Sequence, residues 1–113
     1  MTVARFIQEG ATIDYTPGSA VAAGDVVVLG DLIGIAKRPI DANAIGSLSV
    51  EGVFDVPKAT GVGTAIAVGA IVYWDVADSE AKEDSETGAN KLLGKVIAAA
   101  GDDDAKVRVR LSQ

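Results

Sequence analysis

Hydrophobic and polar residues alternate along much of this chain with a period close to two. The clearest case is residues 105–113, where three aliphatic residues alternate with three cationic ones: Val107, Val109 and Leu111 against Lys106, Arg108 and Arg110. Such alternation is typical of a β-strand with one face buried. Residues 47–56 alternate in the same way, although Val53 interrupts the pattern. Gly52 lies on the apolar side of this segment, which indicates a bulge or a close neighbouring backbone.

Other segments read as strands of different kinds. Residues 26–29 and 71–74 are short continuous apolar runs, as expected for strands that are covered on both faces. Further strands are predicted at residues 32–36, 92–98, 11–15 and 3–8. No segment has the pattern of a long amphipathic helix, and residues 78–90, which are dense in charge, are expected to form an exposed hairpin or loop. The sequence therefore predicts an all-β fold, a small single-domain β-barrel or β-sandwich of short strands spanning residues 1–113.

A short internal repeat lies in this pattern. Residues 19–24, Ser-Ala-Val-Ala-Ala-Gly, match residues 64–69, Thr-Ala-Ile-Ala-Val-Gly, position by position at an offset of 45. Each copy precedes an apolar run, and each run leads to a predicted strand that begins Leu-Ile-Gly or Leu-Leu-Gly. Two interpretations stay open: convergence on one turn-then-strand unit, or an internal duplication.

The composition of the chain excludes several classes of function. The 113 residues are enough for one domain, and they include neither cysteine nor histidine. Disulfides, zinc–cysteine sites and catalysis through histidine are thereby excluded. The net charge of −6 argues against gripping nucleic acid through its phosphates. No apolar run is long enough for a signal peptide or a membrane helix. We expect a protein that is not an enzyme, with no cofactor, no metal, no small-molecule substrate, no nucleic-acid partner and no membrane partner.

Two motifs resemble sites that bind a ligand or an ion. Residues 88–95 resemble a phosphate-binding loop, but five residues separate the glycines where the motif needs four, and Val96 stands where it needs Ser or Thr. Asp102, Asp103 and Asp104 could attract a hard cation, but they lack the ligand spacing of a calcium loop. We interpret them as a solvated acidic turn.

The candidate functional residues are therefore interface residues. Residues 1–8 form a possible N-terminal arm, because Val3, Phe6 and Ile7 make an apolar set around Arg5; the alternative is that residues 3–8 are simply the first strand. Tyr73 and Trp74 are adjacent and point to opposite faces of a strand, so one fills the core and Tyr73 is the candidate interface anchor. Three cations on one strand face either pair with nearby carboxylates or meet an acidic partner: Lys106, Arg108 and Arg110.

Taken in order, several segments resemble the capsid cement, or head decoration, proteins of tailed phages. The most specific are Gly52-Val-Phe-Asp-Val-Pro-Lys58 and Val72-Tyr-Trp-Asp75. The resemblance also includes residues 8–10, 23–27, 34–36, 50–51, 59, 69–71, 93–94 and 107–111, and it extends over nearly the whole chain.

This resemblance implies a structural virion protein on the outside of a phage capsid, made in the cytoplasm of the bacterial host. Its partner would be the major capsid protein, whose neighbouring subunits it would bridge, and it would commonly assemble as a homotrimer. The alternative from the residues alone is a small β-barrel that binds a small ligand or an oligosaccharide. Such a module would need a groove with aromatic side chains and convergent polar groups, and five aromatic residues supply little of that.

Overall fold

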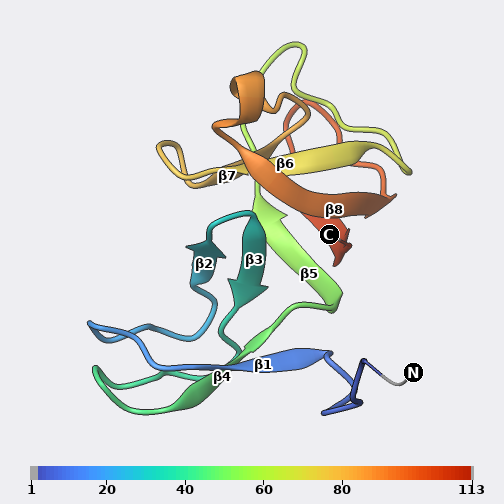
Figure 1. Cartoon of the computed structure of the whole chain (residues 1–113). Helices are drawn as coiled ribbons and strands as arrows, with labels where there is room; N and C mark the ends of the chain where they lie inside the picture. Colours follow the sequence, from blue (N-terminus) through green and yellow to red (C-terminus); the bar gives the residue numbers. More distant parts are fainter. Residues whose placement is uncertain (1–2, 113) are drawn as a thin grey trace.

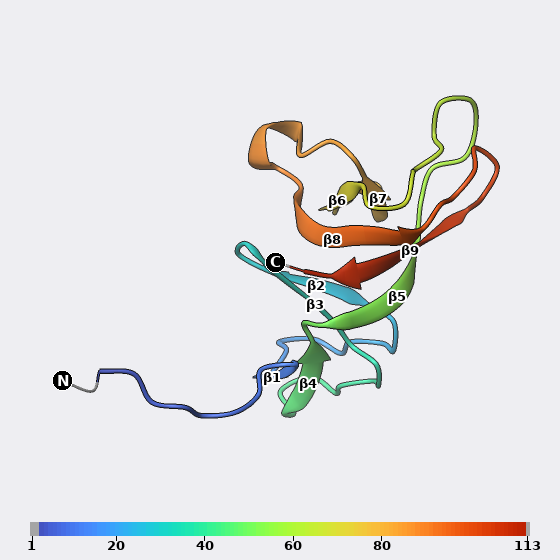
Figure 2. The same cartoon turned by 90° about the vertical axis from the view of Figure 1, so that its right-hand side faces the viewer.

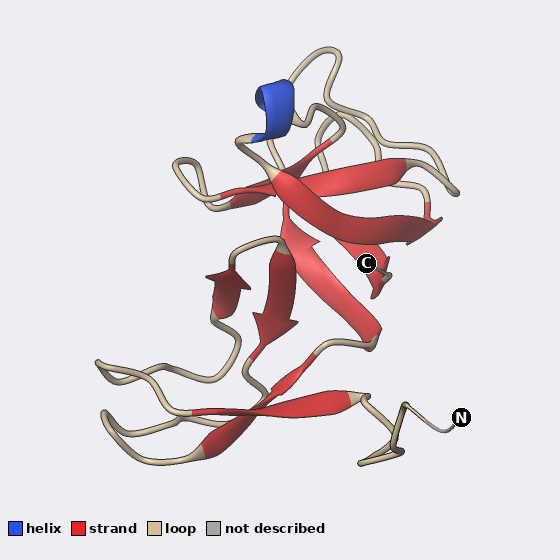
Figure 3. Cartoon of the chain, viewed as in Figure 1, coloured by secondary structure: helices blue, strands red, loops and turns tan. Residues whose placement is uncertain are grey.

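The computed structural model describes residues 3–112, and nearly all of its regular structure is β (Figures 1 and 3). In chain order the strands are β1 Thr12–Tyr15, β2 Val26–Leu29, β3 Leu32–Ile35, β4 Gly46–Ser49, β5 Gly52–Pro57, β6 Ile71–Asp75, β7 Glu80–Lys82, β8 Lys91–Ala98 and β9 Lys106–Leu111. A 3-10 helix, η1 Glu86–Gly88, precedes β8. The all-β prediction is confirmed.

The strands form two antiparallel sheets. The first has the order β1-β4-β3-β2, and the second has the order β5-β9-β8-β6-β7. One isolated parallel bridge, between Lys58 and Ala81, brings the two ends of the second sheet together at a single point. Within the described residues the strands do not close into a barrel, so the β-sandwich alternative describes the molecule.

The alternating segment at residues 47–56 is divided between the sheets. Its first part is β4 of the first sheet and its second part is β5 of the second (Figure 2). Gly52 stands at the crossing with a φ of +120°, a backbone conformation that residues with a Cβ rarely adopt. Apart from Val53, the apolar residues keep the same alternation on both sides of this bend, which is why the sequence indicated one strand where there are two.

The main core lies between the sheets, and its buried residues are aliphatic apart from Trp74. Ile33 and Ile35 of β3 pack there against the inner faces of β6, β8 and β9. A second, smaller cluster of Ala36, Ile40 and Leu48 lies on the opposite face of the first sheet. Accordingly, Val26 and Val28 pack on the main core while Val27 packs on the smaller cluster, so β2 has apolar contacts on both faces as predicted.

The same prediction is wrong for β6. Val72 and Trp74 face the core, but Ile71 is 47% exposed on the outer face. No further layer covers that side of the second sheet within the described residues, so a continuous apolar run here marks a strand with one open face.

The internal repeat of the sequence has a structural counterpart. Val21 exchanges two backbone hydrogen bonds with Ile40, as Ile66 does with Ala100, and the N–H of Gly24 donates to Ala36 as that of Gly69 donates to Val96. The strands correspond as well, because β1-β4-β3-β2 and β5-β9-β8-β6 have the same order and the same antiparallel pairing. These matched bonds support the interpretation as a duplication. The second half differs mainly by its insertion, residues 78–90, which carries β7 and η1.

Candidate interaction surfaces

The N-terminal segment, residues 3–10, is extended and forms no strand. Its apolar side chains are open to solvent: Val3 is 86% exposed, Phe6 77% and Ile7 75%. Arg5 between them is exposed too. Gln8 donates through Nε2 to the carbonyl oxygen of Thr12 at 3.0 Å, which ties the base of the segment to β1. The alternative that residues 3–8 are the first strand is therefore wrong, and four of the predicted interface residues lie together on a projecting segment.

The three predicted cations of β9 point outward. Lys106, Arg108 and Arg110 are exposed, and the alternate residues Val107, Val109 and Leu111 are buried. Arg108 is paired with Asp55 on the neighbouring strand β5: Nε lies 2.9 Å from Oδ1 and Nη2 lies 3.2 Å from Oδ2. The hydrogen bonds from this guanidinium hold the pKa of the Asp55 carboxyl below its usual value. No ion pair joins Lys106 or Arg110 to another residue that the structure describes.

The outer face of the second sheet contains a row that joins the predicted Arg110 to three residues that the sequence did not predict. Register places Ile71, Lys95, Arg110 and Val53 opposite one another across β6, β8, β9 and β5. Ile71 is 47% exposed and Val53 51%, and Lys95 is exposed beside Arg110. We call this row, together with Lys106, the basic face. Lys95 was missed because the alternation within each strand is visible in the sequence, whereas the pairing of β8 with β9 is not.

Tyr73 and Trp74 point to opposite faces of β6, as predicted, and Trp74 is the one that fills the core. Trp74 is 6% exposed and belongs to the main core, and Tyr73 is half-buried on the other face of β6. Alternation along β6 puts Tyr73 on the same side of the sheet as Ile71, so it borders the basic face.

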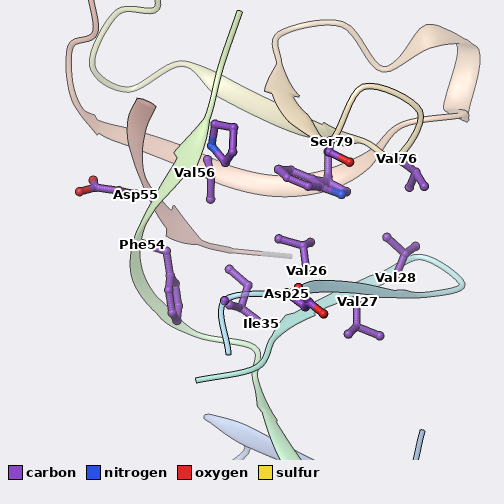
Figure 4. Close-up of a pocket in the computed structure, with 13 residues that line it drawn as sticks. Asp25, Val26, Val27, Val28, Ile35, Phe54, Asp55, Val56, Val76 and Ser79 are labelled. Atoms are coloured by element: carbon purple, nitrogen blue, oxygen red, sulfur yellow. The ribbon is translucent and has the colours of Figure 1, made fainter. Parts of the chain in front are cut away.

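A groove of about 610 Å³ opens between the sheets (Figure 4). It is bounded by the start and length of β2, by Ile35, by β5 from Phe54 to Pro57, and by Trp74, Val76 and Ser79 of the β6–β7 hairpin. Its walls are mainly aliphatic. The Asp55 carboxylate points away from the cavity in Figure 4 and is already bound by Arg108. The size suits a small ligand, but the polar groups of a specific ligand site do not converge in it.

The acidic turn at residues 102–104 is held by hydrogen bonds to other parts of the same chain. Lys58 is 4% exposed, and its Nζ donates to the carbonyl oxygens of Ala59, Gly101 and Asp104 at 2.7–2.9 Å. The carboxylate of Asp102 accepts the N–H groups of Thr64 and Ala65. These bonds give the turn a structural role, and no cluster of potential metal ligands occurs among residues 3–112.

Comparisons with known proteins add the identity of the family. The described part of the chain contains no helix long and apolar enough to cross a membrane. No curated protein and no solved structure shows significant similarity to the chain. A family model described as phage cement protein matches residues 7–111, a range that includes all nine strands of the two described sheets. The expected resemblance is confirmed, and the chain belongs to the phage cement protein family, whose members stabilise the capsid.

Proposed function

We propose that this protein binds the outer surface of a phage head as a homotrimer and bridges neighbouring subunits of the major capsid protein through its basic face. The observation that carries the proposal is the row Ile71, Lys95, Arg110 and Val53. It combines exposed aliphatic side chains with unpaired cations on a protein whose net charge is −6. A surface of this kind fits an acidic protein partner, because complementary charge orients the encounter and apolar contact stabilises the complex.

The mechanism is thermodynamic and needs no catalytic group. A protein that binds the assembled shell, and not its dissociated subunits, stabilises the shell by an amount set by its concentration relative to its Kd. At one hundred times the Kd this amounts to about 2.7 kcal/mol per site. A rigid sheet suits the task, since little conformational entropy is lost when an ordered face docks.

The test uses capsids that lack the cement protein, with added wild-type chain or the double variant Lys95→Glu/Arg110→Glu. We expect the variant to co-sediment with capsids at least tenfold more weakly and to leave their disruption temperature unchanged. Wild-type binding should also weaken as salt rises.

The matched control is Lys37→Glu/Arg38→Glu, which makes the same change of net charge at two exposed residues of the first half. It should bind like wild type. Equal loss in both variants, or none in either, would contradict docking through the basic face.

The trimer is tested separately by light scattering without capsids. The mass of three chains at high micromolar concentration is expected. A monomer mass at that concentration would contradict a trimer formed before docking.

A further inference from the structure

The first sheet has an open edge at the place where the second sheet has an extra strand. In the second half, β6 pairs with β8 on one side and with β7 on the other, through Tyr73–Lys82, Trp74–Ala81 and Asp75–Glu80. The corresponding strand of the first half, β2, pairs only with β3. No strand among residues 3–112 occupies the other side of β2.

The backbone of β2 is oriented to accept such a strand. The N–H of Ala36 donates to the carbonyl oxygen of Asp25, so the backbone carbonyl of Asp25 is directed toward β3. From there the residues of β2 pair one by one with those of β3. Residues of an antiparallel strand direct their backbone groups alternately toward and away from the neighbour, so Val26 and Val28 direct theirs away from β3. An unpaired edge of this kind is a template for a further strand.

The groove lies along this same edge. Val26 and Val28 form one wall, and Phe54 and Val56 of β5 form the opposite wall (Figure 4). A strand added to β2 would therefore place alternate side chains into an apolar cavity of about 610 Å³. Main-chain bonds and side-chain pockets are the two components of recognition by strand addition.

The chain itself contains a segment with the properties of the missing strand. Residues 3–8 are extended, exposed and rich in β-forming residues, with Val3, Phe6 and Ile7 in contact with solvent. Their single cation, Arg5, would lie near Asp25, an exposed carboxylate at one end of the groove.

The position of this segment favours insertion into another molecule. It leads into β1, and β1 and β2 are the two opposite edges of the first sheet. In Figure 2 it runs away from the domain rather than back across the sheet.

We propose that residues 3–8 of one copy add to the open edge of β2 in a second copy, with Phe6 in the groove. This inference rests on the proposed self-assembly and specifies its contact. Donor and acceptor are different surfaces, and such a head-to-tail contact closes into a ring under rotational symmetry, as a trimer requires.

The test exploits the absence of cysteine from the chain. Two single variants, Phe6→Cys and Val28→Cys, carry tags of different size and are mixed without capsids under mild oxidation. We expect a disulfide-linked heterodimer as the main cross-linked product. The control replaces Val28→Cys by Val62→Cys, at a fully exposed residue away from the groove, and its yield should be at least tenfold lower.

Equal yields with Val28→Cys and Val62→Cys would overturn the proposal. So would the double variant Phe6→Cys/Val28→Cys closing its disulfide within one chain at high dilution, since that result would put the segment in its own groove.

A second variant tests the edge without cross-linking. Val28→Pro removes an N–H that points away from β3, so the fold should persist, which circular dichroism checks. Light scattering should then show loss of self-association. Unchanged association of the folded variant would overturn the proposal. Capsid co-sedimentation, measured in parallel, separates the two ideas: binding that survives while the cross-link fails leaves the proposed function standing and rejects only this contact.

Discussion

At the scale of single residues, Trp74 shows how one aromatic ring supports a core whose other buried residues are aliphatic. It is the only tryptophan of the chain and is 6% exposed. It contacts a cluster drawn from β3, β5, β7, β8 and β9 as well as its own strand. Replacing a ring in such a position removes its transfer free energy and leaves a cavity that the neighbours fill only in part.

We therefore expect Trp74→Ala to lower the free energy of unfolding by about 3–5 kcal/mol, a large share of the stability of a small domain. Urea unfolding followed by circular dichroism measures the change. Val62→Ala, at a fully exposed residue, serves as the control and should stay within about 0.5 kcal/mol of wild type. An unchanged midpoint for Trp74→Ala would show that the ring does not support the core.

At the scale of strands, close approach of two backbones decides how β8 packs. A Cβ at Gly94 would overlap the backbone carbonyl oxygen of Arg110 on β9, a clash that no rotation of a side chain relieves. Gly34 holds the corresponding place in β3, where a Cβ would meet the side chain of Leu48 at 2.8 Å. In each half, therefore, a glycine allows two neighbouring strands to approach closely: β8 and β9 at Gly94, and β3 and β4 at Gly34.

Gly94→Ala should separate β8 from β9 and destabilise the domain by at least about 1–3 kcal/mol, the cost of overpacking a tight contact. Thermal melting gives the result. The control is Gly18→Ala, because a Cβ there meets no atom within 4 Å and the backbone is not left-handed. It should be neutral or slightly stabilising. Equal melting temperatures for the two variants would contradict the close contact.

At the scale of the whole molecule, stability should depend on pH through its paired carboxylates. The Asp75 side chain is 5% exposed and accepts bonds from Lys82 and from the N–H of Asp78, which lower its pKa in that order. The hydrogen bonds from Arg108 likewise lower the pKa of Asp55. Because these folded pKa values lie below the value of about 3.9 in an unfolded chain, the unfolded state takes up protons first as the medium is acidified.

The stabilisation from these pairs is thus present at neutral pH and is lost as the pH falls below about 5. We expect the urea midpoint to be nearly constant from pH 8 to 5 and then to decline. Asp75→Asn should be less stable at pH 7 and should show a shallower decline in acid. A decline as steep as that of wild type would mean that Asp75 contributes little to the acid response.

Much of this molecule follows from the local pattern of its sequence. The alternation of valines with cations fixed the two faces of β9, and Trp74 could be separated from Tyr73 by periodicity alone. The absence of histidine and cysteine excluded disulfides and catalysis through histidine, and the specific segments around Phe54 and Trp74 indicated the family. These features depend only on neighbours along the chain, which is why they were predictable.

The tertiary structure decided what depends on residues far apart. The bend at Gly52 places β4 and β5 in different sheets. Strand register places Lys95 beside Arg110, and Arg108 pairs with the carboxylate of Asp55 on β5. Likewise Lys58, for which the local pattern predicts no structural role, donates hydrogen bonds to the acidic turn more than forty residues away. Pairing between strands is set by long-range packing and leaves no periodic trace within either strand, so only the fold could show which charges meet and which edge stays open.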